Sequence, residues 1–97
     1  MSLTGKQRNT LRGLAHHLKP VIIVGDAGVT ATVLNEINLA LDHHELVKIK
    51  LRVGDRHNRR SALENICDET GAEAVQEIGQ IAVIYRAAPE PKINLPK

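Results

Sequence analysis

The spacing of apolar residues along the chain predicts three helices. In residues 3–18, apolar side chains recur every three to four positions, which is the repeat of one buried helical face, at Leu11, Leu14, Ala15 and Leu18. Thr30 is expected to cap a second helix that ends near residue 43. A third helix is expected from a cap at Asp55 or Asn58 to about residue 70, with Gly71 as its C-terminal stop.

Four strands are expected between and after these helices. Residues 46–53 alternate in character, with apolar side chains on one face (Val47, Ile49, Leu51, Val53) and basic ones on the other (Lys48, Lys50, Arg52). The apolar run 21–24 is typical of a central parallel strand. Residues 74–78 and 81–86 indicate a hairpin that turns at Gly79 and Gln80. The order α-β-α-β-α-β-β predicts an α/β domain whose first three strands run parallel and whose last is antiparallel.

Charge is divided into blocks, although the net charge of the 97-residue chain is only +2. Residues 1–24 hold four basic and no acidic residues, and residues 25–47 hold four acidic and no basic ones. Residues 48–60 then hold six basic residues and one acidic residue, whereas residues 61–83 hold five acidic and no basic ones. This segregation predicts one basic face and one acidic face.

Composition limits the possible functions. Because the chain has no Phe or Trp and only Tyr85, it cannot recognise RNA by stacking bases on an aromatic platform. The longest apolar run is far shorter than the roughly 20 residues of a membrane span, and residues 1–8 show no secretory signal. We therefore expect a cytoplasmic protein with one domain, residues 1–88, and an extended tail, residues 89–97.

The candidate binding residues are basic side chains and one glycine loop. Arg8, Arg12, His16 and Lys19 are spaced to form one exposed line on the first helix, opposite its leucines, and the basic face of residues 46–53 forms a second line. Arginines near the start of the third helix oppose its dipole, an arrangement that an anionic partner would explain. The loop from Gly25 to Gly28 precedes a helix, where backbone N–H groups can receive a phosphate, and Asp26 is its acidic exception. The alternative is that each basic run only solvates an outer face.

No pattern predicts a metal site, a cofactor or an enzymatic centre. Adjacent histidines, at 16–17 and 43–44, point in different directions on a helix and do not form a chelate. The single Cys67 has no partner for an intramolecular disulfide. The carboxylates are scattered, and the sequence contains no phosphate-binding loop, dinucleotide fingerprint or nucleophile elbow.

Several segments together resemble the YhbY-type CRM domain, a name that stands for chloroplast RNA splicing and ribosome maturation. They are residues 4–7 (TGKQ), 11–16 (LRGLAH), 19–21 (KPV), the glycine loop followed by Val-Thr at 25–30, and 69–71 (ETG). The resemblance runs over essentially the whole chain, and the tail also looks like that of the bacterial stand-alone form.

The resemblance implies a two-layer fold similar to the C-terminal domain of translation initiation factor 3, with a mixed four-stranded sheet. It also implies an RNA-binding protein without a cofactor that associates with precursors of the large (50S) ribosomal subunit. The glycine loop is compared within the family to the loop of KH domains that contacts the nucleic-acid backbone, which here corresponds to Gly25 and Gly28. Asp26 departs from the small, polar or basic residue expected inside that loop. We expect a monomer, the default for a domain of this size.

The basic residues and the family resemblance point to the same hypothesis. A basic surface made by the first helix, the glycine loop and the second strand holds the phosphates of structured ribosomal RNA, and it recognises shape and backbone more than base identity. The expected RNA-binding residues are Lys6, Arg8, Arg12, Lys19, Gly25, Gly28, Lys48, Lys50, Arg52, Arg56, Arg59 and Arg60. The alternative is a protein-interaction module whose basic lines or tail dock a ribosomal protein or assembly factor.

Overall fold

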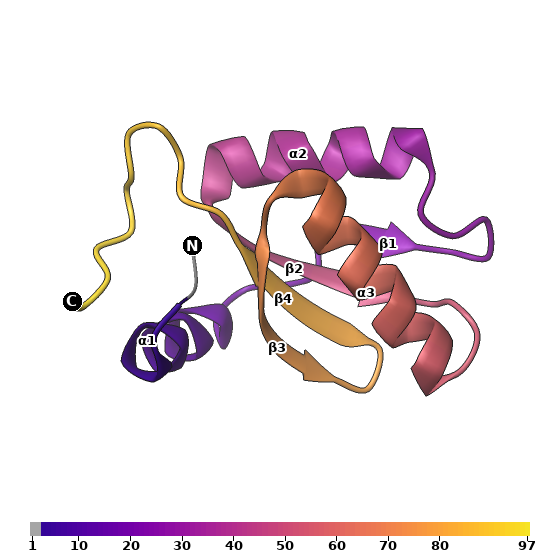
Figure 1. Cartoon of the computed structure of the whole chain (residues 1–97), viewed down its shortest axis with the longest axis horizontal. Helices are drawn as coiled ribbons and strands as arrows, with labels where there is room; N and C mark the ends of the chain where they lie inside the picture. The colour runs from indigo at the N-terminus through magenta and orange to yellow at the C-terminus, as the bar shows by residue number, and fades with distance from the viewer. Residues whose placement is uncertain (1–2) are drawn as a thin grey trace.

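Seven elements follow one another in the computed structural model, which describes residues 3–97. They are α1 (Gly5–Ala15), β1 (Ile22–Val24), α2 (Ala31–His44), β2 (Leu46–Leu51), α3 (Arg56–Thr70), β3 (Glu73–Ile78) and β4 (Ile81–Tyr85), as Figure 1 shows. The predicted element order is confirmed. None of the helices in the described part of the chain has the length and apolar character to cross a bilayer.

Local signals in the sequence fix the ends of the helices. Thr4 caps α1 through a capping box with Gln7, and the Thr30 hydroxyl accepts the Val33 N–H at the start of α2. At the start of α3, the Asp55 carboxylate accepts the Asn58 N–H at 2.9 Å. Gly71 ends α3 with a φ of 75°, a left-handed conformation that glycine adopts without strain. The caps predicted at Thr30, Asp55 and Gly71 are therefore confirmed.

The sheet has the strand order β1-β2-β4-β3. β1 pairs parallel to β2, and β4 is antiparallel to both β2 and β3, so the first three strands run in one direction, as predicted. The expectation that β1 is a central strand was wrong. It is an edge strand, and Ile23 is 57% exposed, because the helices cover only one face of the sheet at this edge.

The first face of the sheet packs against α2 and α3. Its buried residues include Val47, Ile49 and Leu51 of β2, which the alternating pattern predicted, and Ile37 and Ile66 of the two helices. Burial of such aliphatic side chains supplies about 1.5–3 kcal/mol each. This cluster is the main hydrophobic core.

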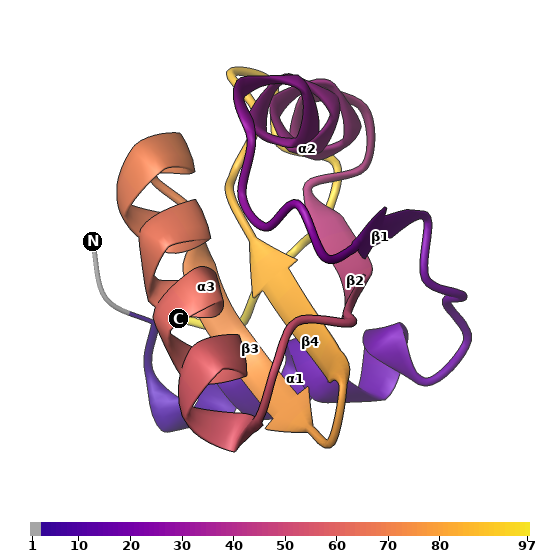
Figure 2. The ribbon, with the colours of Figure 1, turned by 90° about the vertical axis from the view of Figure 1, so that its right-hand side faces the viewer.

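The second face of the sheet carries a smaller core beneath α1. Leu11 and Ala15 of α1 pack there with Leu46, Val83 and Tyr85. Since successive residues of a strand point to opposite faces, Val83 and Tyr85 lie on the side opposite Ala82 and Ile84 of the main core. The structure thus adds a partial third layer to the two that were expected, and Figure 2 shows α1 separated by the sheet from α2.

The leucine stripe predicted for residues 3–18 is only partly buried. Leu11 and Ala15 are buried, but Leu14 and Leu18 are 45% and 37% exposed. The helix ends at Ala15, four residues before Lys19, so that Leu18 lies in the connection to β1. Helical periodicity predicted continuation to residue 18, whereas the turn at residues 16 and 17 redirects the chain towards the sheet edge.

Long-range polar contacts hold the C-terminal segment. The buried Glu45 carboxylate accepts the backbone N–H groups of Ala88, Lys92 and Ile93.

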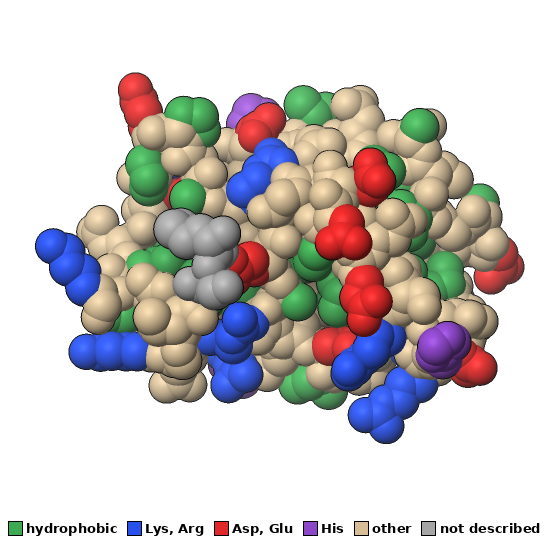
Figure 3. Space-filling view, in the orientation of Figure 1, with side chains coloured by type: hydrophobic (Ala, Val, Ile, Leu, Met, Phe, Trp, Pro, Cys, Tyr) green, Lys and Arg blue, Asp and Glu red, His purple; other side chains and the backbone are tan. Residues whose placement is uncertain are grey.

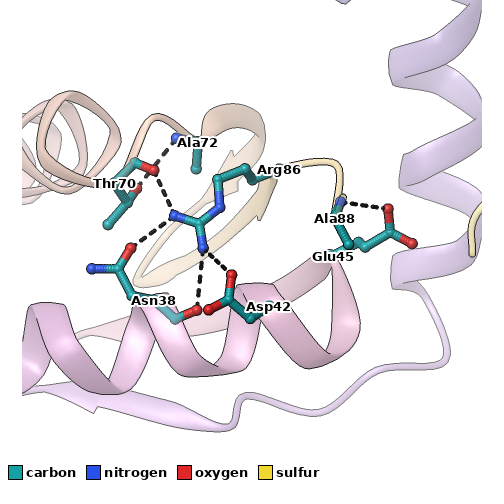
Figure 4. A network of polar contacts seen from close by, with 7 residues as sticks. All are labelled: Asn38, Asp42, Glu45, Thr70, Ala72, Arg86 and Ala88. Atoms are coloured by element: carbon teal, nitrogen blue, oxygen red, sulfur yellow. Dashed lines mark hydrogen bonds and ion pairs between the residues drawn. The ribbon is translucent and has the colours of Figure 1, made fainter. Parts of the chain in front are cut away.

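Arg86 joins two helices, because its guanidinium donates to the Thr70 carbonyl at the end of α3 and to Asn38 and Asp42 of α2. Figure 4 shows Arg86 at the centre of this network and the contact between Glu45 and Ala88.

Candidate nucleic-acid interface

Three basic side chains follow β2 on the second face of the sheet; we call Lys48, Lys50 and Arg52 the basic strip. The register places Lys48 opposite Val83, and Lys50 between Ile23 and Ile81. Only two ion pairs form among residues 3–97, Arg60–Glu77 and Arg86–Asp42, so no member of the strip has an acidic partner there. The strip therefore presents uncompensated positive charge on a surface whose neighbouring side chains are aliphatic.

No helix covers the end of the second face that carries Lys50. Ile23 and Ile78, on the two edge strands, lie in the same cross-strand row as Lys50 and are 57% and 65% exposed. α1 covers only the other end of this face, near Leu46 and Tyr85. Lys50 and Arg52 are therefore accessible to a partner from this end of the face.

The loop between β1 and α2 forms a tight turn beyond the end of the strip; we call Gly25–Gly28 the glycine turn. The Gly28 N–H donates to the Gly25 carbonyl at 2.9 Å, and Gly28 has a φ of +76°. Gly25 has no positive φ, and a Cβ added there would meet no atom within 4 Å. Neither backbone strain nor packing therefore requires glycine at position 25, but its absence of a side chain leaves the backbone open to close approach.

The basic strip and the glycine turn meet at one hollow. It has a volume of about 520 Å³ and is lined by Ile23, Gly25, Asp26, Arg52, Gly54 and Gln80. Asp26 is exposed and lines the same hollow as Arg52, but the two side chains form no ion pair. Sequence reasoning missed Ile23 and Gln80, because only the packing of β1 and of the β3–β4 turn beside β2 brings them here.

The line of cations predicted along α1 is interrupted. The Arg8 guanidinium donates to the Ala74 carbonyl of β3 and is half-buried, so it has a structural partner. Lys19 lies beyond the end of α1 and is exposed. Lys6 and Arg12 remain exposed on the helix. The expectation of one exposed line of four side chains on a single helix was therefore wrong.

Acidic residues line the groove that Arg8 and Arg12 face. This groove, of about 770 Å³ between α1, α3 and β3, is lined on its other side by Glu64, Asp68, Glu73 and Glu77. Figure 3 shows acidic side chains gathered over α3 in the middle of this view. The predicted segregation of charge thus gives an acidic surface over α3 and β3, next to α1.

The arginines near the start of α3 form a separate cluster. Arg56, Arg59 and Arg60 line a hollow of about 310 Å³ together with Glu77 and Gly79. The Arg60 guanidinium lies 3.5 Å from the Glu77 carboxylate, and both Arg56 and Arg60 are exposed. These side chains lie at the same end of the sheet as the glycine turn, because Gly79 and Gln80 are adjacent residues of one hairpin turn.

Metal-binding side chains are not clustered in the described part of the chain. Among residues 3–97, no three His, Cys, Asp or Glu side chains are placed to hold a metal ion. The half-buried Cys67 has its pKa raised to about 11 by burial and by the nearby carboxylates of Asp68 and Glu73. Its thiol therefore stays protonated near neutral pH and is a poor nucleophile.

The fold and this site define a small α/β domain with an unpaired basic strip that leads to a glycine turn. The chain belongs to the CRS1/YhbY (CRM) domain family, whose sequence model matches residues 3–86. The resemblance seen in the sequence is thereby confirmed.

Relatives in three bacteria support this assignment. An RNA-binding protein of Haemophilus influenzae is 48% identical over 99% of this chain and 97% of its own length. A probable RNA-binding protein of Pseudomonas aeruginosa is 43% identical over 98% of this chain and 91% of its own length. The solution structure of a Staphylococcus aureus protein, described as a candidate RNA-binding protein, is similar with a TM-score of 0.85 and 34% identity, and the match covers 98% of this chain and 100% of that one. None of these descriptions is that of an enzyme, in agreement with the expectation from the sequence.

Proposed function

We propose that this protein binds structured ribosomal RNA through its phosphate backbone and assists assembly of the large (50S) ribosomal subunit. The observation that carries the proposal is the basic strip, whose three cations form no ion pair among residues 3–97. Lys50 and Arg52 lie at the open end of the sheet face, and Lys48 lies beside the end of α1. The names of the relatives, as RNA-binding proteins, support the same class of ligand.

Each part of the site has a distinct role in this proposal. Lys48, Lys50 and Arg52 contact successive phosphates, and the glycine turn lets the RNA backbone come close to the protein backbone at Gly25. The exposed arginines at the start of α3 extend the contact along the same end of the sheet. The acidic residues Glu64, Asp68 and Glu73, which lie beyond the arginines along α3 and at the start of β3, repel RNA, so that the RNA is held on one side of the domain only. Since the chain has no aromatic platform, recognition depends on shape and on the backbone.

The salt dependence of RNA affinity tests the role of the strip. Each phosphate contact releases counterions and contributes about 0.7–0.9 to the slope of log K against log salt, so replacing all three cations with glutamine should lower that slope by about 2 to 3. The control replaces Lys92 and Lys97, which are exposed and lie outside the predicted RNA-binding residues, with glutamine, and the matched strip variant replaces Lys50 and Arg52 alone. If the control double variant loses as much slope as this matched strip variant, RNA binding depends on net charge alone and the strip is not the site.

A second variant tests the glycine turn. Gly25→Ala should fold normally, because a Cβ at this position meets no atom within 4 Å, but it should weaken RNA binding by obstructing the approach of the backbone. Gly13→Ala, at an exposed position of α1 with equally open surroundings, is the control and should bind normally. Unchanged affinity of Gly25→Ala would exclude the turn from the interface.

Sedimentation of cell lysate through a sucrose gradient tests the ribosomal part of the proposal. The tagged protein should migrate with precursors of the large subunit at low salt and leave them at high salt. A protein that stays at the top of the gradient at every salt concentration is not an assembly factor of the ribosome.

A further inference from the structure

A second surface combines exposed aliphatic side chains with cations, and it is separate from the open end of the sheet face that carries Lys50. It is a groove of about 430 Å³ between the end of α1, the chain leading into β1, the start of β2 and the C-terminal segment. Leu14, Leu18, Val21 and Ile93 contribute aliphatic side chains to its walls. We call it the aliphatic groove.

The exposure of these walls is unusual for this molecule. Leu14 and Leu18 are exposed although the helical pattern predicted them to be buried, and Val21 is 60% exposed. Ile23 of the edge strand β1 extends the apolar surface, so that four of the six large exposed hydrophobic residues among residues 3–97 lie between positions 14 and 23. Exposed apolar surface that is gathered in one place marks an interaction site more often than scattered residues do.

The charges around the groove have one sign. Lys19 and Lys48 lie at its edge, as do His17 and His44, and no carboxylate-bearing residue lines it. Glu45, which lies in the sequence between the lining residues His44 and Leu46, is buried, and its carboxylate accepts three backbone N–H groups of the C-terminal segment. The groove therefore combines an apolar floor with an uncompensated basic rim.

We propose that the aliphatic groove binds a short, acidic amphipathic segment of a partner protein. Aliphatic side chains of that segment insert between Leu14, Leu18 and Val21, while its carboxylates pair with Lys19 and Lys48. This docking mode uses apolar contacts for affinity and charge for orientation.

Two other occupants fit the groove less well. A second copy of this chain in a two-fold dimer would bring Lys19 and Lys48 close to the same cations of the other copy, and like charges would oppose association. The phosphates of an RNA strand would satisfy the lysines, but its charged backbone would leave the aliphatic walls formed by Leu14, Leu18 and Val21 without apolar contacts. The proposal does not depend on the RNA-binding function, because Lys48 is the only residue that the groove shares with the basic strip.

A synthetic peptide of alternating leucine and glutamate, titrated into the full chain and followed by amide NMR, tests the proposal. It should shift the amide signals of Leu14, Leu18 and Val21. Two control peptides, with lysine in place of glutamate or with serine in place of leucine, should not shift them. Equal binding of the serine peptide would show that charge alone attracts the ligand, and the absence of shifts with the leucine–glutamate peptide would likewise overturn the proposal.

Substitutions in the protein give the affinity test. Leu18→Ala removes a side chain that the bound peptide would bury, so the affinity for the peptide should fall about tenfold. Leu39→Ala removes an equally large exposed leucine on α2, outside the groove, and should change nothing. If a ribosomal RNA fragment displaces the peptide and shifts the same amides, the groove belongs to the RNA interface. If dilution of the protein alone shifts them, the groove is a dimer contact. Either result overturns the proposal.

Discussion

Replacing Glu45 with glutamine removes one charge at the point where the C-terminal segment is tied to the domain. Its carboxylate accepts the N–H groups of Lys92 and Ile93 at 2.6 and 3.0 Å on one oxygen, and that of Ala88 at 3.0 Å on the other. Glu45 is only 1% exposed, so water cannot replace these contacts. Glutamine keeps one acceptor oxygen and replaces the other with an NH2 group, which is a donor. That donor faces either the Ala88 N–H or the N–H groups of Lys92 and Ile93 and cannot accept a hydrogen bond from them.

The expected loss follows from this count of contacts. Hydrogen bonds to a charged group contribute about 1.5–3 kcal/mol each, whereas neutral ones contribute about 0.5–1.5 kcal/mol. Losing at least one bond and the charge on the others should lower the free energy of unfolding by about 2–3 kcal/mol. For a domain of this size that corresponds to a Tm lower by about 10 °C or more. Residue 45 has a φ of 62°, and glutamine and glutamate are equally strained there, so the backbone strain cancels in the comparison.

The pH dependence of stability gives an independent test of the same contact. Burial acts to raise the pKa of the Glu45 carboxyl, but the three backbone hydrogen bonds and Lys92 outweigh it, so that the pKa is below its ordinary value of 4.5. A carboxyl with a lowered pKa in the folded state contributes stability that is present above the unfolded value and is lost as the pH falls through the folded value. The free energy of unfolding of the Glu45→Gln variant should therefore fall less between neutral and acid pH than that of the unmodified protein.

Urea unfolding near neutral pH and in acid, combined with hydrogen exchange of the Lys92 and Ile93 amides, measures both effects. Glu36→Gln, which removes an exposed carboxylate from the same helix, is the control and should match the unmodified protein. Stability and amide exchange in Glu45→Gln that match those of the control would refute the reasoning, because the carboxylate would then contribute nothing to holding the C-terminal segment.

Two further predictions concern Arg86 and Cys67. Arg86→Lys should lower the free energy of unfolding in urea by about 1–3 kcal/mol, because an ammonium group cannot reach the Thr70, Asn38 and Asp42 oxygens together. The control is Asp42→Asn, which alters only the ion pair with Arg86. It should change the free energy of unfolding by less than about 1 kcal/mol in the same assay. Because the Cys67 pKa is raised from 9.0 to about 11, its alkylation by iodoacetamide in mild base should be about a hundred times slower in the folded protein than in urea; equal rates would mean that the thiol is not shielded.

Features set by near neighbours in the sequence could be predicted, and features set by distant ones could not. The caps at Thr30 and Asp55 form between residues three positions apart, and the buried face of β2 follows from alternation alone. Glu45 and Arg86, by contrast, bind partners as far as 48 positions away. The sequence does not predict these hydrogen bonds, because glutamate and arginine are also common on solvated surfaces, where they have no such partners.

The burial of apolar residues was predicted wrongly at one edge of the sheet. Leu14, Leu18 and Ile23 fit the helix and strand patterns as well as buried residues do, but they lie where no other element packs. A pattern shows which side chains share a face, but only the packing of the whole chain shows whether that face is covered. These wrong predictions identify the aliphatic groove, since an apolar residue that the fold leaves uncovered is available to a partner.

Binding at the two proposed surfaces depends on salt to different degrees, which makes them separable. Phosphate contacts at Lys50 and Arg52 weaken steeply as counterions accumulate. Apolar contacts at Leu14 and Leu18 are insensitive to ordinary screening, and only the contribution of the rim lysines falls. A partner held in the groove should therefore remain bound at a salt concentration that releases RNA. Lys48, which belongs to both surfaces, is the residue through which occupancy of one can affect the other.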